Sequence, residues 1–162
     1  MKNKIYENEY VTVFKNEKGY VRVSQRYGGV VVIPRYHSTY ALIVHSRDKG
    51  ESIEFPRGFI ENGEEHISGG ERELKEELNL SSVESYIIGD LHTDTGLLID
   101  NVKAIVCEVS NPADIVLQAS EGVLSCDFYQ LEDILVLIKN GKIKDNFTLS
   151  ALMLLCANTI EL

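Results

Sequence analysis

Residues 58–80 read GFIENGEEHISGGERELKEELNL and are the most informative part of the chain. The second half has the pattern of an amphipathic helix, because apolar positions recur at spacings of seven and four among charged residues: Ile67, Leu74 and Leu78. Asn79 follows the last apolar position and readily adopts the left-handed conformation that ends a helix. The stretch therefore predicts a helix over residues 64–78.

The predicted helix and its approach are strongly acidic. Seven glutamates fall between residues 61 and 77, against two basic residues. Carboxylates three and four residues apart share one helical face, so Glu73, Glu76 and Glu77 can converge within about one turn. Like charges at this spacing destabilise a bare helix unless a divalent cation compensates them. On composition alone, a solvated acidic face is the simpler interpretation.

The residues around the glutamates favour the cation, because their spacing resembles the Nudix box. Gly58 is followed after five residues by Glu64. Seven residues later, RELKEELNL at 72–80 matches the Arg-Glu-apolar-x-Glu-Glu-x-Gly-apolar end of the box. Asn79 replaces the last glycine but can still adopt its left-handed conformation. Two glycines at 69 and 70 stand where the family usually has alanines, which weakens helix propensity but removes no carboxylate.

Segments outside the box resemble the ADP-ribose and ADP-sugar pyrophosphatases of the Nudix superfamily. Residues 52–59, SIEFPRGF, are similar to the strand that leads into the box of that subgroup, and residues 131–139 with GKIKDNFTLSAL at 141–152 are similar to its C-terminal segment. The resemblance implies the Nudix fold, of the α/β (α+β) class, with a mixed β-sheet between helices in an α/β/α arrangement. It also implies a Nudix hydrolase domain over 28–162, containing the box at 58–80. An N-terminal β-hairpin extension over 1–27 precedes it, and the subgroup forms homodimers through that extension.

Sequence patterns predict further strands and helices on both sides of the box. Residues 10–14 and 20–25 alternate in hydrophobicity and form a hairpin signal with Gly19 in the turn. Other strands are predicted at 30–33, 40–45, 52–55, 86–91, 102–109 and 127–129, and helices at 131–139 and 148–158. Strands on both sides of a helix, followed by terminal helices, indicate a mixed sheet covered by helices.

The resemblance implies a metal site on the acidic helix. Glu73 and Glu77 are the expected main ligands, Glu76 is a third, and the carbonyl oxygen of Arg57 is a further one. Oxygen ligands suit hard divalent cations, so Mg²⁺ is the expected cofactor and Mn²⁺ its substitute. Such a cation offsets the charge of a pyrophosphate that would otherwise repel the attacking water.

Other residues are expected to act beside the metal. Arg72 would orient the carboxylates by bidentate pairing, and Glu64 would support the start of the helix. Arg47, Arg57 and Gly58 are the expected substrate-binding residues, with the two arginines on phosphate. The alternative for each arginine is an ordinary surface position.

In the ADP-ribose-cleaving subgroup a loop after the box supplies the general base. The segment QASEG at 118–122 lies in the corresponding place, Glu121 is its only acid, and Gly122 gives it freedom to close over substrate. Two alternatives stay open: an exposed loop carboxylate at Glu121, and a base on the box as in other Nudix enzymes. The aromatic candidates for a nucleobase slot are Tyr27, Tyr36, Tyr40 and Phe59.

Composition excludes several classes of protein. The length of 162 residues fits one domain, and 16 basic against 25 acidic residues give a formal charge of −9. This charge argues against a nucleic-acid partner, because phosphate-backbone binding needs a basic face. No apolar run approaches the roughly 20 residues of a membrane span. Because the three cysteines form neither a metal nor a disulfide pattern, we expect a cytoplasmic protein.

The sequence thus predicts a Mg²⁺-dependent Nudix pyrophosphohydrolase that acts on a nucleoside diphosphate derivative. By resemblance, the expected substrate is ADP-ribose or an ADP-sugar, and the products are AMP and a sugar phosphate. Hydrolysis of a nucleoside triphosphate or a dinucleoside polyphosphate is the alternative within the superfamily. An alternative of another class is a non-catalytic sensor of nucleotide sugars, which the full set of box carboxylates disfavours.

Overall fold

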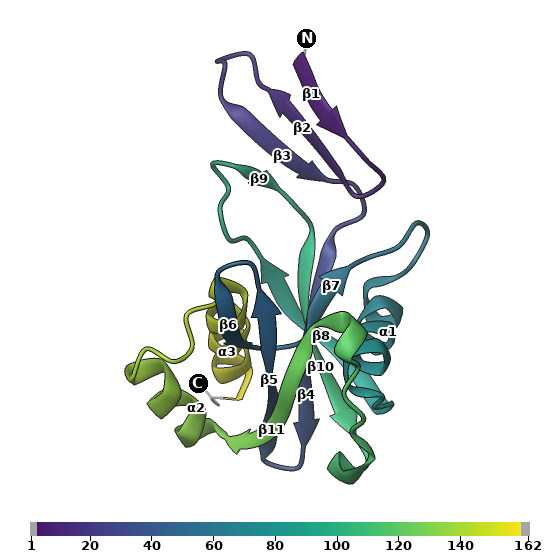
Figure 1. Cartoon of the computed structure of the whole chain (residues 1–162), viewed down its shortest axis with the longest axis vertical. Helices are drawn as coiled ribbons and strands as arrows, with labels where there is room; N and C mark the ends of the chain where they lie inside the picture. The colour runs from purple at the N-terminus through teal and green to yellow at the C-terminus, as the bar shows by residue number, and fades with distance from the viewer. Residues whose placement is uncertain (1–2, 160–162) are drawn as a thin grey trace.

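The computed structural model describes residues 3–159, which form two β-sheets and three α-helices (Figure 1). The strands of the larger sheet are β4 (Gly29–Tyr36), β5 (Thr39–Arg47), β6 (Gly50–Glu54), β7 (Arg57–Phe59), β8 (Ser82–Leu91), β10 (Val102–Val109) and β11 (Val123–Gln130). Their order is β11-β5-β4-β10-β8, with β6 paired to β5 and β7 paired to β4. Because β10 runs parallel to β4 while the other pairs are antiparallel, the sheet is mixed as predicted.

The central strand β4 is covered on both faces. Val30 and Val32 belong to one buried apolar cluster, and Val31 and Ile33 belong to a second one. Successive side chains of a strand point to opposite faces, so an unbroken apolar run is what a doubly covered strand requires. The sheet therefore separates two cores.

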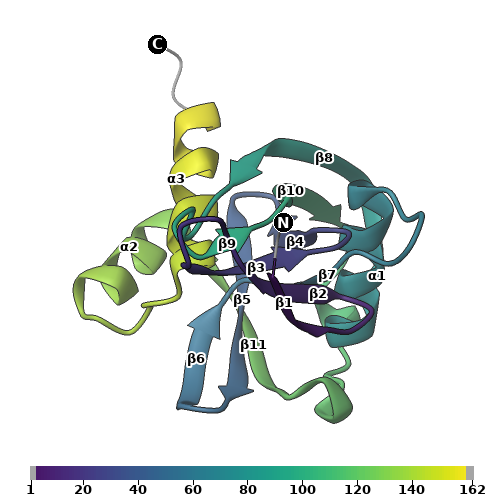
Figure 2. The same cartoon turned by 90° about the horizontal axis from the view of Figure 1, so that it is seen from above.

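Helices cover these two cores. α1 (His66–Leu78) contributes Leu74 and Leu78 to the cluster that contains Val30, and α3 (Asn146–Thr159) contributes to the other cluster. α2 (Leu131–Lys139) adds Ile134 on the side of α3. Seen from above, α1 and α3 lie on opposite sides of the sheet (Figure 2). The α/β/α layering inferred from the sequence is confirmed.

The first helix begins two residues later than predicted and ends where predicted. Glu65 precedes it in extended conformation, and the Glu64 carboxylate accepts a hydrogen bond from the backbone N–H of Glu61 at 2.9 Å. Asn79 closes the helix in the left-handed conformation, with φ of 57°, and its N–H donates to the carbonyl of Lys75. Gly69 and Gly70 are buried against Ile60 and Ile105, so the helix packs closely on the sheet there.

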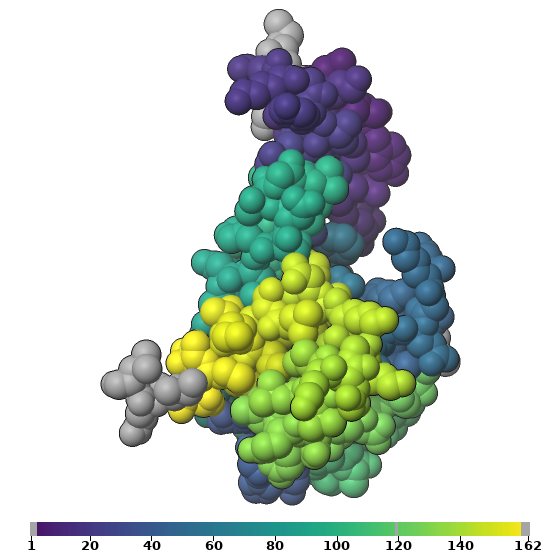
Figure 3. Space-filling view, turned by 90° about the vertical axis from the view of Figure 1, so that its left-hand side faces the viewer, coloured from purple at the N-terminus to yellow at the C-terminus, as the bar shows by residue number. Residues whose placement is uncertain are grey.

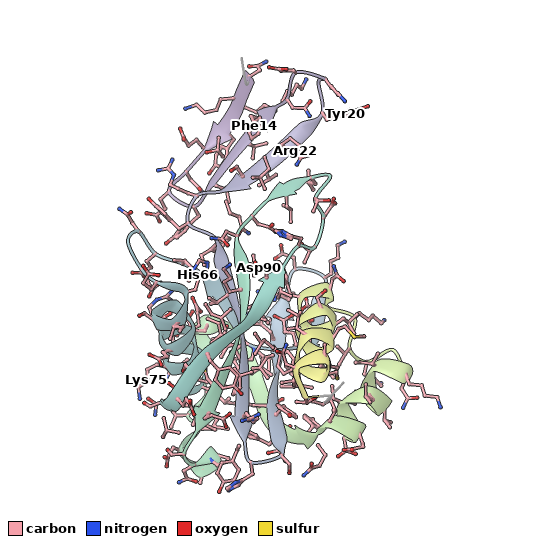
Figure 4. All side chains as sticks on the ribbon, turned by 180° about the vertical axis from the view of Figure 1, so that it is seen from behind. Phe14, Tyr20, Arg22, His66, Lys75 and Asp90 are labelled. Atoms are coloured by element: carbon pink, nitrogen blue, oxygen red, sulfur yellow. The ribbon has the colours of Figure 1, made fainter. Side chains whose placement is uncertain are left out.

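The N-terminal residues form a separate sheet that extends beyond the body of the molecule (Figure 3). The predicted hairpin corresponds to β2 (Val11–Lys15) and β3 (Val21–Gln25), flanked by β1 (Asn3–Glu7) and β9 (Leu98–Ile99). The guanidinium of Arg22 donates to the carbonyls of Thr95 and Gly96 at 2.8 and 2.9 Å (Figure 4). Pairing of β3 with β9 and the Arg22 contacts attach the N-terminal strands to the rest of the chain.

Several element boundaries differ from the prediction. The strands β1, β7 and β9 were not expected, and β11 begins four residues before the predicted strand at 127. Two short 3-10 turns, η1 (Pro112–Asp114) and η2 (Ala119–Glu121), lie in the segment between β10 and β11. α3 begins at Asn146 because Asp145 caps it, accepting a hydrogen bond from the Thr148 N–H at 2.8 Å. Within residues 3–159, no helix is long and apolar enough to cross a membrane.

Candidate active site

A cavity of about 530 Å³ opens beside the N-terminal half of β4, between α1, β7 and the N-terminal sheet. Its walls contain both acidic and basic side chains. The lining residues that were expected from the sequence are Arg47, Arg57, Gly58, Arg72, Glu73, Glu76, Glu77 and Glu121. Among the expected catalytic, metal-binding and phosphate-binding residues, Glu64 alone is absent from the lining, and it pairs with Arg72. The fold therefore brings together residues that are more than seventy positions apart in sequence.

Gly58 and Glu73 meet where β7 passes under α1. A Cβ atom on Gly58 would lie 2.0 Å from Oε1 of Glu73, so a larger residue would displace this carboxylate from its position. Gly58 is held in the sheet by pairing with Val30 of β4. The glycine at the start of the box thus gives the Glu73 carboxylate steric clearance, and it also lines the cavity.

Arg72 ties the acidic residues together. Its Nε and Nη2 donate to the two oxygens of Glu64 at 3.0 Å each, which is a bidentate pair. Nη1 donates to Glu73 at 2.7 Å and to Glu76 at 2.8 Å, and Nη2 also donates to the carbonyl of Phe59 at 2.7 Å. Arg72 therefore sets the positions of three carboxylates at once. By contrast, Lys75 lies on the outer face of α1 (Figure 4).

Glu77 is the most deeply placed carboxylate of the cavity. It is 4% exposed, and its buried Oε2 has no hydrogen-bond partner among the described residues. Burial, followed by the charge of Glu73, raises the pKa of Glu77 to about 8. Burial also raises the pKa of Glu73, although Arg72 opposes the shift. The site holds more negative charge than its own basic residues compensate.

The donor chemistry of these residues fits a divalent cation. Carboxylate oxygens are the ligands that Mg²⁺ prefers, and the unpartnered Oε2 of Glu77 is a buried oxygen of the kind that binds such a cation. In the described part of the chain no three acidic, histidine or cysteine side chains already surround one point, because Arg72 holds Glu73 and Glu76.

A basic wall stands beside the carboxylates and is organised by Glu54, which was not among the residues expected from the sequence. Glu54 is 1% exposed at the end of β6 and accepts from Nε of Arg47 at 3.1 Å and from its Nη2. Nε of Arg57 lies 3.5 Å from the same oxygen. Arg57 also approaches Asp145 at 3.5 Å and lies over the ring of Phe147.

The charge of Glu54 is maintained in spite of its burial. Burial tends to raise the pKa of Glu54, but hydrogen bonds from Arg47 and Ser52 and the charge of Arg57 bring it below the ordinary value. The only sequence feature that pointed to Glu54 was its place between two arginines, near the end of a predicted strand. Such a pattern cannot distinguish a buried ion-pair centre from a surface one.

Glu121 reaches the same cavity from the loop just before the edge strand β11. It ends the turn η2, is exposed to solvent, and its charge contributes to the raised pKa of Glu73. Gly122 follows with φ of 78°, and its carbonyl accepts a hydrogen bond from the Ser46 N–H at 2.9 Å. Gly122 packs on the ring of His45, a buried residue that also lines the cavity.

Two aromatic rings stand at the mouth of the cavity. Tyr10 and Phe59 are stacked with ring centroids 5.3 Å apart, and both are partly exposed. Phe59 was a candidate from the sequence, whereas Tyr10 was not, since their contact joins the N-terminal sheet to β7. The other aromatic candidates, Tyr27, Tyr36 and Tyr40, pack in the two cores and are not among the lining residues.

Comparisons with known proteins agree with this architecture. The NUDIX domain family matches residues 25–150. A solved structure described as "Crystal structure of ADP compounds hydrolase" superimposes with a TM-score of 0.72 at 19% sequence identity, covering 97% of this chain and 90% of that chain. Among curated proteins none matches. At this identity the structural likeness shows a common fold.

Proposed function

The chain belongs to the NUDIX domain family and is a Nudix hydrolase, and we propose that it cleaves the pyrophosphate of a nucleoside diphosphate derivative. ADP-ribose or an ADP-sugar is the proposed substrate, giving AMP and a sugar phosphate. The observation that carries the proposal is one cavity that joins the box carboxylates, two arginines and a stacked aromatic pair. A nucleotide linked through a pyrophosphate to a second group contains a chemical group that complements each of these three features of the cavity. The name of the structural neighbour is consistent with this substrate class.

Nudix domains generally use a divalent metal, and we propose Mg²⁺, with Mn²⁺ as a substitute. Glu73, Glu76 and Glu77 would hold it, together with the carbonyl oxygen of Arg57. When bound, the cation neutralises the pyrophosphate and lowers the pKa of water. Arg72, which now pairs with Glu73 and Glu76, would keep Glu64 as its partner when those carboxylates turn to the cation.

The remaining residues bind the substrate and move the proton. Arg47 and Arg57 would hold phosphate oxygens, and the Tyr10–Phe59 pair would stack on the base. Glu121 carries no metal in this proposal, so its carboxylate can accept the proton of the attacking water when the loop before Gly122 closes. The cavity volume of about 530 Å³ lies within the usual range for small-molecule sites.

A substrate panel tests the proposal. The full chain is incubated in Mg²⁺ with ADP-ribose, ADP-sugars, nucleoside triphosphates and dinucleoside polyphosphates, and AMP or inorganic phosphate release is measured. We expect the highest kcat/KM for an ADP-linked sugar. Preferred cleavage of a triphosphate or a dinucleoside polyphosphate would show that the substrate belongs to that class instead of the ADP-sugars. Tight binding of a nucleotide sugar without any turnover would indicate a sensor.

The cellular setting and the assembly belong to the same proposal. All three cysteines are free thiols, which is consistent with the reducing cytoplasm. The N-terminal sheet exposes apolar side chains, which is consistent with a homodimer formed through it.

A further inference from the structure

A buried carboxylate stands behind the two arginines of the cavity. Glu54 is 1% exposed and is not among the described residues that line the cavity, whereas Arg47 and Arg57 both line it. One oxygen of Glu54 accepts from Arg47 and lies 3.5 Å from Nε of Arg57. A single carboxylate therefore contacts one edge of both guanidinium groups.

We propose that Glu54 is a positioning residue that holds Arg47 and Arg57 together as one anion-binding fork. This inference rests on the proposed function in one respect: if that function is right, the anion that the fork binds is a phosphate of the substrate. Two guanidinium groups this close repel each other unless a negative charge lies between them. Glu54 accepts from Nε and Nη2 of Arg47 and lies 3.5 Å from Nε of Arg57, while Asp145 lies 3.5 Å from Nη2 of Arg57. Among the described residues, the Nη1 donors of both groups are therefore left for an anion in the cavity.

A second set of contacts fixes Arg57 in the same orientation. Its Nη2 lies 3.5 Å from Oδ1 of Asp145, and its Cζ lies 5.1 Å from the centroid of the Phe147 ring. Asp145 is itself fixed, because its other oxygen caps α3 through Thr148. Arg47 has no comparable second support in the described residues, so the fork depends on Glu54 most strongly at Arg47.

The position of Glu54 gives its substitution two effects of opposite sign on anion binding. Glu54→Gln removes a negative charge near the cavity, which by Coulomb's law alone would tighten the binding of an anion. The same change weakens the hydrogen bonds that align Arg47 and removes the charge that attracts Arg57, which would loosen anion binding. Since the two arginines already neutralise Glu54 at short range, we expect the alignment effect to dominate.

The test measures the binding of inorganic pyrophosphate to the full chain in excess Mg²⁺ by isothermal titration calorimetry. Glu54→Gln is expected to weaken the affinity about 10-fold or more, on the scale of a lost charge-assisted hydrogen bond. Glu108→Gln is the matched control, because Glu108 forms a partly buried ion pair with Arg35 away from the cavity. Its affinity is expected to equal that of the unsubstituted chain.

Further variants separate alignment from general damage. Glu54→Asp keeps the negative charge but has a shorter side chain, which withdraws the charge from the arginines, so it should also weaken pyrophosphate binding. If Glu54→Gln does not fold, Glu54→Asp serves as the test of alignment. In a chain carrying Arg47→Gln and Arg57→Gln, Glu54→Gln should weaken binding no further. With a substrate, the expected change from Glu54→Gln is a KM raised about 10-fold with a smaller loss in kcat.

Equal or tighter pyrophosphate binding by folded Glu54→Gln would overturn the proposal, as would the absence of pyrophosphate binding by the unsubstituted chain. The binding experiment needs no turnover. Failure of every nucleotide in the substrate panel would therefore refute the proposed function while leaving the arginine fork supported or refuted by its own measurement.

Discussion

Burial of the Glu77 carboxylate makes the stability of the metal-free protein depend on pH. Its pKa is raised from the ordinary 4.5 to about 8 in the folded chain. Between these pH values the folded state keeps a proton that the unfolded state has lost, so the free energy of unfolding falls as pH rises. For Glu77 alone the slope is at most on the order of 1.4 kcal/mol per pH unit.

We predict that Glu77→Gln makes the metal-free protein more stable than the unsubstituted chain at the alkaline end of this window. The variant lacks the carboxylate that must ionise in a buried site, so its free energy of unfolding in urea should fall less with pH. Added Mg²⁺ should stabilise the unsubstituted chain and have little effect on the variant. Turnover of the variant at saturating Mg²⁺ should fall about 100-fold or more.

Glu65→Gln controls for the loss of one charge, because Glu65 is exposed just before the same helix. Its pH dependence should match that of the unsubstituted chain. Identical slopes for Glu77→Gln and the unsubstituted chain would show that the buried carboxylate does not control stability.

Replacing Glu121 by Gln tests the general base. The amide keeps the shape of the side chain but cannot accept the proton, so we expect kcat to fall by about 10²–10⁴-fold. Metal affinity should be nearly unchanged, since Glu121 is not one of the proposed ligands. Steady-state kinetics and a Mg²⁺ titration of the two proteins measure both effects.

Glu61→Gln is the matched control for Glu121, because Glu61 lines the same cavity and is 65% exposed. It removes the same charge from the cavity and should leave kcat close to normal. If Glu121→Gln keeps full activity while Glu73→Gln is inactive, the base lies on the helix.

Residues of the site differed in how well they could be predicted. Those of the box lie close together in sequence at a specific spacing, so their convergence follows from helical geometry. Glu54 and Tyr10 could not be found in this way. Glu54 matters because tertiary packing buries it between two arginines, and Tyr10 because the N-terminal sheet carries it to Phe59.

At the C-terminus of α1, a single residue has a conformational cost that can be removed. Asn79 has φ of 57°, where glycine is favoured over residues that carry a side chain. We predict that Asn79→Gly stabilises the protein by a few tenths of a kcal/mol to about 1 kcal/mol. Thermal and urea unfolding measure the change.

Asn140 provides the control for Asn79, since it ends α2 with a φ of −85°. Glycine has no conformational advantage there, so Asn140→Gly should be neutral or destabilising. A gain of the same size at both positions would mean that the left-handed conformation is not the cause.

Elements could be predicted where their own sequence had a clear period. β4, β10 and the helices α1 and α2 have long apolar patterns, and the structure confirms them. β7 and β9 contain three and two residues, too few for any period. β7 is a strand because it pairs with β4, and β9 is a strand because it pairs with β3. A local sequence pattern does not contain information about such distant partners.

At the scale of the whole molecule, one face of the N-terminal sheet carries an apolar row that is partly exposed to solvent. Tyr6, Val13, Val23 and Leu98 are paired across its four strands, so they share this face. Tyr6 is 55% exposed. A second copy of the chain that covered this row would remove apolar surface from water, which is the physical basis for the proposed homodimer.

We therefore predict that the full chain is a dimer in solution and that removal of residues 1–27 makes it monomeric, as measured by light scattering coupled to size-exclusion chromatography. Tyr6→Glu should also dissociate it, because a charge on the covered face must be desolvated. Ile99→Glu is the control, since Ile99 pairs with Ser24 on the opposite face and is 41% exposed. A monomeric full chain, or a dimer that survives the truncation, would show that this face does not mediate assembly.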